Sequence, residues 1–66
     1  MKITINGNDH ILEDGTSIAG MLKELNLDPR KFAIEQNLAI IAAEEYENII
    51  IADGDIIEVV QFIGGG

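Results

Sequence analysis

The sequence predicts an α+β domain in which one main helix packs on one face of a mixed sheet of four to five strands. Three observations lead to this class. One segment has helical periodicity, several short segments have strand alternation between turn signals, and the final strand is apolar on both of its faces. At 66 residues the chain is one domain with a modest core, predicted over residues 1–63 and followed by a glycine tail at 64–66.

The first predicted element is a β-hairpin. Residues Lys2–Asn6 alternate polar and apolar side chains, which is typical of a half-buried strand. Asn6-Gly7-Asn8 is a hairpin turn signal, because Asn and Gly tolerate positive φ. The segment His10–Glu13 is the predicted return strand.

The main helix follows the hairpin, with Thr16 as its predicted N-cap. One apolar stripe at the spacing i, i+3, i+4 and i+7 consists of Ile18, Met21, Leu22 and Leu25. Asn26 can end the helix in a left-handed conformation, and Asp28-Pro29 prevents its continuation.

The second half of the chain contains shorter elements. In order, the pattern predicts a strand at Phe32–Gln36, a turn at Asn37-Leu38, a strand at Ala39–Ile41, one helical turn at 42–46, an apolar run at Ile49–Ile51, a tight turn at Asp53–Asp55 and a last strand at Ile56–Ile63. Two carboxylates in that tight turn are too few for a calcium site, so turn chemistry is the preferred interpretation of Asp53 and Asp55.

The last strand is predicted to be central and to leave one apolar face uncovered, because one helix cannot cover both faces of a sheet. We assign Ile57 and Val59 to the core. A docking patch of Val60, Phe62 and Ile63 is predicted at the end of the strand. A core position for Phe62 is the alternative, since a shift of one residue in register exchanges the two faces.

The segment Gly64-Gly65-Gly66 is predicted to be a thin tail with few backbone restrictions. Such a tail can enter a narrow partner active site and present the Gly66 carboxylate for chemistry. A frayed terminus without function is the alternative.

Charge excludes some partners. The net charge is -8, and the only basic residues are Lys2, Lys23, Arg30 and Lys31, so nucleic acid is not an expected partner. The half of the chain after Lys31 is uniformly acidic, which favours encounter with a basic protein surface. A solvated surface that only keeps the domain in solution is the alternative.

Composition also bears on metals and location. The chain has no Cys and one His, His10, so neither a disulfide nor a metal site is expected. No apolar leader or membrane span is visible, so a cytoplasmic location is expected, with no membrane partner. No paired His and nucleophile and no phosphate-binding glycine motif occur in the sequence. We therefore expect a protein co-substrate, not an enzyme.

Several short motifs occur in a fixed order along the chain: Met1-Lys2-Ile3 with Asn6-Gly7, then Asp14–Ile18, Leu22, Leu25, Leu27–Pro29, Phe32–Glu35, Asn37, Glu45-Tyr46, Asp53–Asp55, Ile57–Val60 and the terminal glycines. In this order they resemble the ubiquitin-like β-grasp family and, within it, the ThiS family of sulfur carrier proteins of thiamine thiazole synthesis. The chain departs from the family pattern at Leu38, where Gly is usual, and at Ala42-Ala43, where Pro and a basic residue are frequent.

The resemblance implies a ubiquitin-like β-grasp fold and a carrier of sulfur as a thiocarboxylate at Gly66. It implies as partners a ThiF-like adenylating enzyme, which uses ATP and magnesium, a persulfide sulfur donor and a ThiG-like thiazole synthase. No bound cofactor is expected, and the free protein is expected to be a monomer. Three alternatives stay open: a carrier for molybdopterin or another sulfur-transfer pathway, a ubiquitin-like protein modifier, and an interaction module with an inert tail.

Overall fold

The computed structural model describes residues 1–62 and contains a five-stranded sheet, one α-helix and one short 3-10 helix. Their bounds are β1 Lys2–Ile5, β2 Asn8–Ile11, α1 Ile18–Glu24, β3 Phe32–Gln36, β4 Ala39–Ile41, η1 Ala43–Glu45 and β5 Ile56–Gln61. The predicted fold class is confirmed. Ile63 and the predicted tail at 64–66 lie outside the described residues.

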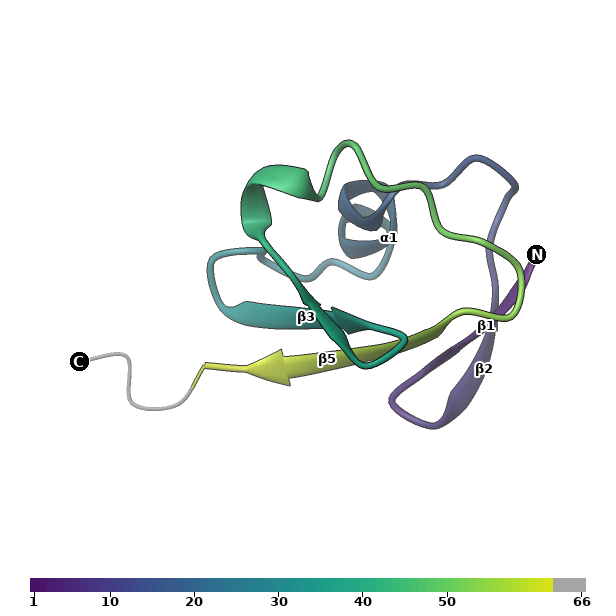
Figure 1. Cartoon of the computed structure of the whole chain (residues 1–66), viewed down its shortest axis with the longest axis horizontal. Coiled ribbons are helices and arrows are strands. Elements are labelled where there is room, and N and C mark those ends of the chain that lie inside the picture. The colour runs from purple at the N-terminus through teal and green to yellow at the C-terminus, as the bar shows by residue number, and fades with distance from the viewer. Residues whose placement is uncertain (63–66) are drawn as a thin grey trace.

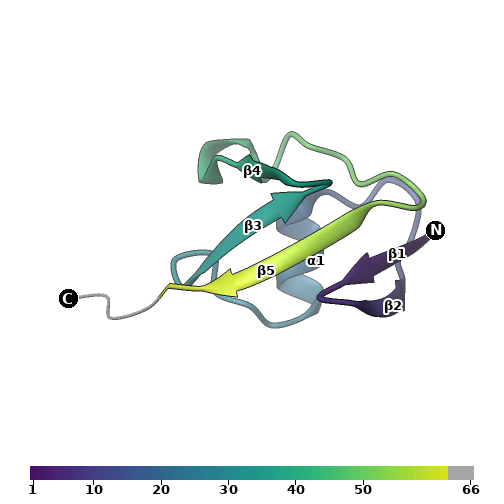
Figure 2. The same ribbon diagram turned by 60° about the horizontal axis from the view of Figure 1, so that its bottom comes forward.

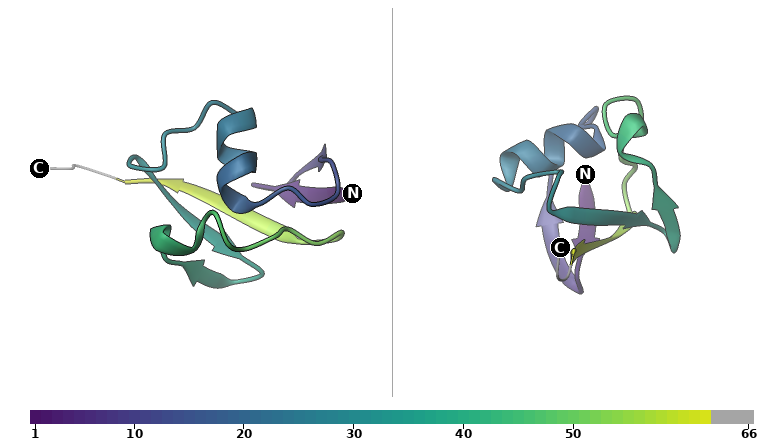
Figure 3. Two further views of the ribbon diagram at one scale, coloured as in Figure 1. Left: turned by 90° about the horizontal axis from the view of Figure 1, so that it is seen from above. Right: turned by 90° about the vertical axis from the view of Figure 1, so that its left-hand side faces the viewer.

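The sheet is mixed and β5 lies at its centre. The strand order is β2-β1-β5-β3-β4, in which β1 and β5 are parallel and the other neighbours are antiparallel. Both helices lie on one side of the sheet (Figures 1 and 3). The other side is uncovered by any described element, and we call it the open face.

The first hairpin has a two-residue turn with positive φ at Asn6 (49°) and Gly7 (83°). This geometry matches the twist of the flanking strands, so pairing resumes at once with Ile5 opposite Asn8. The return strand is therefore Asn8–Ile11, and the prediction of His10–Glu13 was displaced toward the C-terminus.

The N-cap of α1 is Ser17, and the prediction of Thr16 was wrong by one residue. The Ser17 hydroxyl accepts a hydrogen bond from the Gly20 backbone N–H at 3.0 Å. The Thr16 hydroxyl instead donates to the Glu13 carbonyl at 2.7 Å. Thr16 therefore stabilises the preceding turn, and the helix begins one residue later.

The predicted apolar stripe of α1 is confirmed. Ile18, Met21 and Leu22 are buried, while Leu25 packs on the edge of the core and caps the helix. Asn26 has φ 58°, the left-handed conformation expected after the helix end. The full core consists of Ile3, Ile5, Leu12, Ile18, Met21, Leu22, Ile34, Ile41, Tyr46, Ile51 and Ile57.

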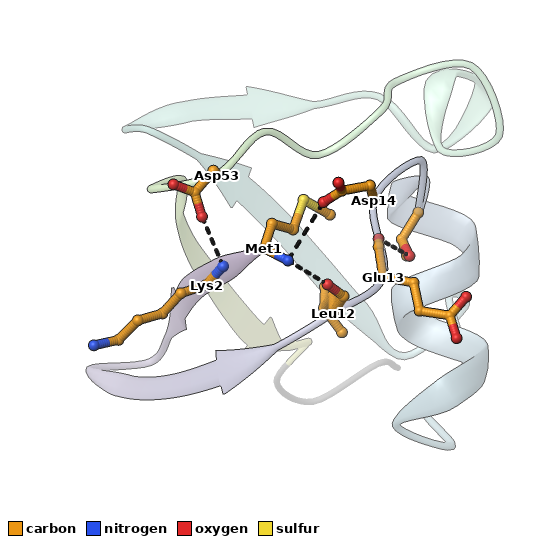
Figure 4. Close-up of polar contacts among 7 residues, drawn as sticks. Met1, Lys2, Leu12, Glu13, Asp14 and Asp53 are labelled. Carbon is orange, nitrogen blue, oxygen red and sulfur yellow. Dashed lines mark hydrogen bonds and ion pairs between the residues drawn. The ribbon is translucent and has the colours of Figure 1, made fainter.

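The beginning of β1 is held by polar contacts with the turn before β5 and with the end of the first hairpin (Figure 4). The Lys2 backbone N–H donates to an Asp53 carboxylate oxygen at 2.7 Å. The Met1 ammonium donates to the Leu12 carbonyl at 2.7 Å and lies 3.4 Å from the Asp14 carboxylate. Asp53 therefore links the turn before β5 to the start of β1, a contact between distant segments that the sequence interpretation as turn chemistry did not include.

None of the helices within residues 1–62 has both the length and the apolar composition needed to cross a membrane.

The turn between β3 and β4 holds a leucine in an unfavourable backbone conformation. Asn37 and Leu38 have φ 52° and 72°, and the Leu38 side chain is 89% exposed. A residue with a Cβ pays roughly 1 kcal/mol or more in this region, whereas glycine does not.

Leu38→Gly is therefore expected to raise the free energy of unfolding by about 1 kcal/mol, since it removes strain without removing burial. Urea denaturation followed by circular dichroism measures this change. The matched control is Leu38→Ala, which keeps the strain and should leave stability close to wild type. A glycine variant no more stable than the alanine variant would contradict the prediction.

Candidate functional site

The end of β5 exposes the two described residues of the predicted docking patch. Ile57 is fully buried and Val59 packs against the core, whereas Val60 and Phe62 are 50% and 57% exposed on the open face. Figure 2 shows this side, with β5 crossing in front of α1. The predicted assignment of Ile57 and Val59 to the core side and of Val60 and Phe62 to the exposed side agrees with the structure.

The backbone at the end of β5 is held in place on both sides. Val60 pairs with Ala33 of β3, and the Phe62 N–H donates to the Lys31 carbonyl at 2.9 Å. On the β1 side, the Asn6 side chain accepts from the Val59 N–H at 2.8 Å and donates to the Val59 carbonyl at 3.1 Å. Val60 and Phe62 are thus presented from a fixed strand. Ile63, the third residue of the predicted patch, and the tail residues Gly64, Gly65 and Gly66 lie outside the described residues.

The exposed apolar surface extends beyond the predicted patch. The strand registers place Ile40 of β4 and Ile56 of β5 on the open face, and they are 78% and 50% exposed. Apolar side chains at several positions of one uncovered sheet face form a surface suited to protein contact.

Two carboxylates occupy the middle of this surface. Glu35 of β3 lies directly opposite Glu58 of β5, and Ile40 lies opposite Glu35 on the other side. Both glutamates are half-buried, and neither accepts a hydrogen bond or forms an ion pair within residues 1–62. The sequence analysis missed this pair because it did not predict that β3 and β5 are neighbours.

Asp55 is the most buried carboxylate among the described residues, and it joins the β3–β4 turn to the start of β5. Its side chain accepts hydrogen bonds from the Ala52 N–H at 2.9 Å, from Gln36 Nε2 at 2.8 Å and from Asn37 Nδ2 at 3.0 Å. Asn37 Oδ1 in turn accepts from the Ile56 N–H at 2.9 Å. This network sets the position at which β5 begins.

Burial raises the pKa of Asp55, but the hydrogen bonds from Ala52, Asn37 and Gln36 outweigh it, so the pKa lies below its ordinary value of 3.8. A carboxyl with a lowered pKa in the folded state stabilises the protein above its unfolded-state pKa. That contribution is lost as pH falls from about 4 through the lower folded-state pKa.

Asp55→Asn is expected to cost about 2 kcal/mol at neutral pH and to flatten the fall in stability below pH 4, since it removes the charged acceptor. Melting temperatures between pH 2 and 7 for both proteins test this. Asp28, whose pKa is lowered by hydrogen bonds from Arg30, is present in both proteins and cancels in the comparison. Parallel melting curves across the acid range would contradict the prediction.

A groove of about 740 Å³ lies between α1, the α1–β3 loop and η1. Its lining is largely apolar, with basic side chains on the α1 side and acidic ones on η1: Ala19, Leu22, Lys23, Leu27, Pro29, Arg30, Ala43, Glu44, Tyr46 and Glu47. Within residues 1–62 there is also no group of three or more His, Cys, Asp or Glu side chains placed to hold a metal ion.

Comparisons with known proteins bear on the family and the fold of this chain. The family model described as "ThiS family" matches residues 3–66. The sulfur carrier protein ThiS of Bacillus subtilis is 34% identical over 65 residues, which covers 97% of this chain and 98% of that protein. A crystal structure of the thiamine biosynthesis protein ThiS from Geobacter metallireducens has a TM-score of 0.89 and 25% identity, with both chains covered completely.

A longer relative is a thiazole synthase of Magnetococcus marinus, 44% identical over 66 residues. The whole of this chain is covered by that match but only 20% of the relative, so the chain spans about a fifth of that protein's length. The family match over nearly the whole sequence, the Bacillus relative of equal length and the shared ubiquitin-like β-grasp fold agree: this chain belongs to the ThiS family of sulfur carrier proteins in thiamine biosynthesis.

Proposed function

We propose that this chain carries sulfur as a thiocarboxylate on Gly66 and donates it for synthesis of the thiamine thiazole ring. A ThiF-like adenylating enzyme would activate the carboxylate with ATP and magnesium, a persulfide would supply the sulfur, and a ThiG-like thiazole synthase would receive it. The chain is a co-substrate in each step, and the catalytic groups belong to its partners.

The chemistry requires activation because a carboxylate is a poor electrophile. A Gly66 carboxylate oxygen attacks the α-phosphate of ATP, which forms an acyl-adenylate and releases pyrophosphate. The terminal sulfur of a persulfide then attacks the acyl carbon, and AMP leaves. A thiol attacks the S–S bond of the resulting acyl disulfide, so that a mixed disulfide departs and the thiocarboxylate remains. Because the chain has no Cys, the persulfide and the thiol both come from partners.

The observation that carries this proposal is the extent of the family match, which runs through residues 3–66 and therefore includes the three terminal glycines. Glycine at Gly64, Gly65 and Gly66 offers no side chain to obstruct entry into a narrow active site. The open face, on which Val60 and Phe62 are exposed, supplies apolar area for docking an activating enzyme.

The match within a thiazole synthase supports that enzyme as a partner. A region like this chain forms about a fifth of the Magnetococcus protein. Linking two modules raises their effective concentration, which favours transfer of a group from one to the other. We therefore propose thiazole synthase as the receiver of the sulfur, in preference to a molybdopterin pathway or a protein-modifier role.

The test is the intact mass of the protein after incubation with the adenylating enzyme, ATP, magnesium and a persulfide source. The expected result is a gain equal to the replacement of one oxygen by sulfur, located on the C-terminal peptide. The same reaction without ATP is the control and should give no gain. An unchanged mass, with the enzyme shown to be active on another carrier, would refute the proposal.

A further inference from the structure

We propose that the Glu35–Glu58 pair is the charged centre of the docking surface and receives an arginine side chain of the adenylating enzyme. The identity of this partner rests on the proposed function. The surface itself is defined by the described residues of the open face: Glu35 and Glu58, with Ile40, Ile56, Val60 and Phe62 around them.

The pair is unusual among the carboxylates of this chain. Most of the others are exposed. Of the two less exposed ones, Asp28 accepts a hydrogen bond from Arg30. Asp55 accepts hydrogen bonds from Ala52, Gln36 and Asn37. Glu35 and Glu58 are half-buried, directly opposite each other and without a polar partner within residues 1–62. Like charges at directly opposite positions on neighbouring strands are destabilising. A cation between them would remove this repulsion.

The surroundings favour a guanidinium over a small ion. Ile40 adjoins Glu35, and Ala33 pairs with Val60 one step further along the same face. An arginine can lay its apolar stem on such side chains while its planar head donates to carboxylates on two strands. A hydrated metal ion would gain nothing from the apolar border.

A second copy of this chain is a poor occupant. The net charge is -8, and an identical face would bring two Glu35–Glu58 pairs toward each other. Lys2 is the basic residue of β1 on the same face, and its Nζ already forms an ion pair with the Asp9 carboxylate at 3.3 Å. The complementary surface is therefore a different protein with an apolar patch and a positive centre.

The experiment measures the Kd for the adenylating enzyme by titration calorimetry for wild type, Glu35→Gln, Glu58→Gln and the double variant, at low and high salt. The controls are Glu24→Gln and Glu47→Gln, which remove exposed carboxylates on α1 and after η1. Each open-face variant is expected to weaken binding about tenfold and to reduce its salt dependence, whereas the controls stay within about twofold. Melting temperatures of the open-face variants should equal or exceed that of wild type, because repulsion is removed.

The outcomes separate this inference from the proposed function. If the thiocarboxylate forms and the open-face variants bind like wild type, or no worse than the controls, the inference is overturned and the function stands. If wild type binds and the variants lose affinity but no thiocarboxylate forms, the docking surface stands and the function falls. If wild type does not bind the enzyme, both are overturned.

Discussion

Removal of Gly66 is expected to abolish sulfur loading, so that no mass gain is detected under conditions in which wild type is converted. The acyl carbon that reacts would then belong to Gly65, one residue short of the position at which the proposed partner places it. Misplacement of a reacting atom by even about 1 Å costs on the order of 100-fold in rate, and a missing residue displaces the carboxylate by about 3.3 Å or more.

The same deletion should leave folding and docking unchanged. Within residues 1–62 the fully buried core side chains run from Ile3 to Ile57, and Val59 packs against them, so we expect the melting temperature to match that of wild type. The Kd for the adenylating enzyme should rise by no more than a few fold, since the open face is intact. A large drop in melting temperature, or sulfur loading at the wild-type rate, would show that the role assigned to Gly66 is wrong.

Ile57→Ala is expected to cost about 3 kcal/mol of the free energy of unfolding, because it opens a cavity where β5 crosses the core. Ile57 is fully buried at the centre of the sheet. A domain of this size has only about 3–5 kcal/mol from its core, so the variant should be partly unfolded at 25 °C. Ile57→Val is expected to cost only about 1 kcal/mol. This variant should stay folded, so its free energy of unfolding can be measured by urea denaturation and compared with that of wild type.

Phe62→Ala is the matched substitution of an exposed apolar side chain, one residue after the end of β5. Phe62 is 57% exposed, so we expect less than about 1 kcal/mol of destabilisation together with a loss of affinity for the adenylating enzyme. The two variants should thus separate stability from binding. Wild-type binding combined with a clear stability loss in Phe62→Ala would place that ring in the core and would remove it from the docking surface.

The sequence by itself determined the elements of this protein, because each depends on neighbours a few residues apart. The i, i+3, i+4 stripe of Ile18, Met21 and Leu22 identified α1, and Asn6-Gly7 identified the first hairpin. The family resemblance was also carried by short motifs in order. Alternation also places Ile57 and Val60 on different faces of β5, but only burial in the structure decided that the face with Ile57 is the core.

Local errors arose where two residues compete for one role. Thr16 and Ser17 are both good N-caps, and only the position of the Gly20 N–H in the first turn of α1 decides that the Ser17 hydroxyl accepts it. The return strand began at Asn8 and not at His10 because the two-residue turn leaves no unpaired residue.

Only the tertiary structure decided which strands are neighbours, and the candidate surface follows from that choice. Glu35 and Glu58 are 23 residues apart in the sequence (58 minus 35), and nothing local indicates that they face each other. The sequence pattern indicates only a turn role for Asp55, whereas the fold places Gln36 and Asn37 where they donate hydrogen bonds to its carboxylate. Periodicity in the sequence indicates the direction in which a side chain points. Contacts between distant segments depend instead on how the whole core packs. In this protein the central position of β5 in the sheet determines those contacts.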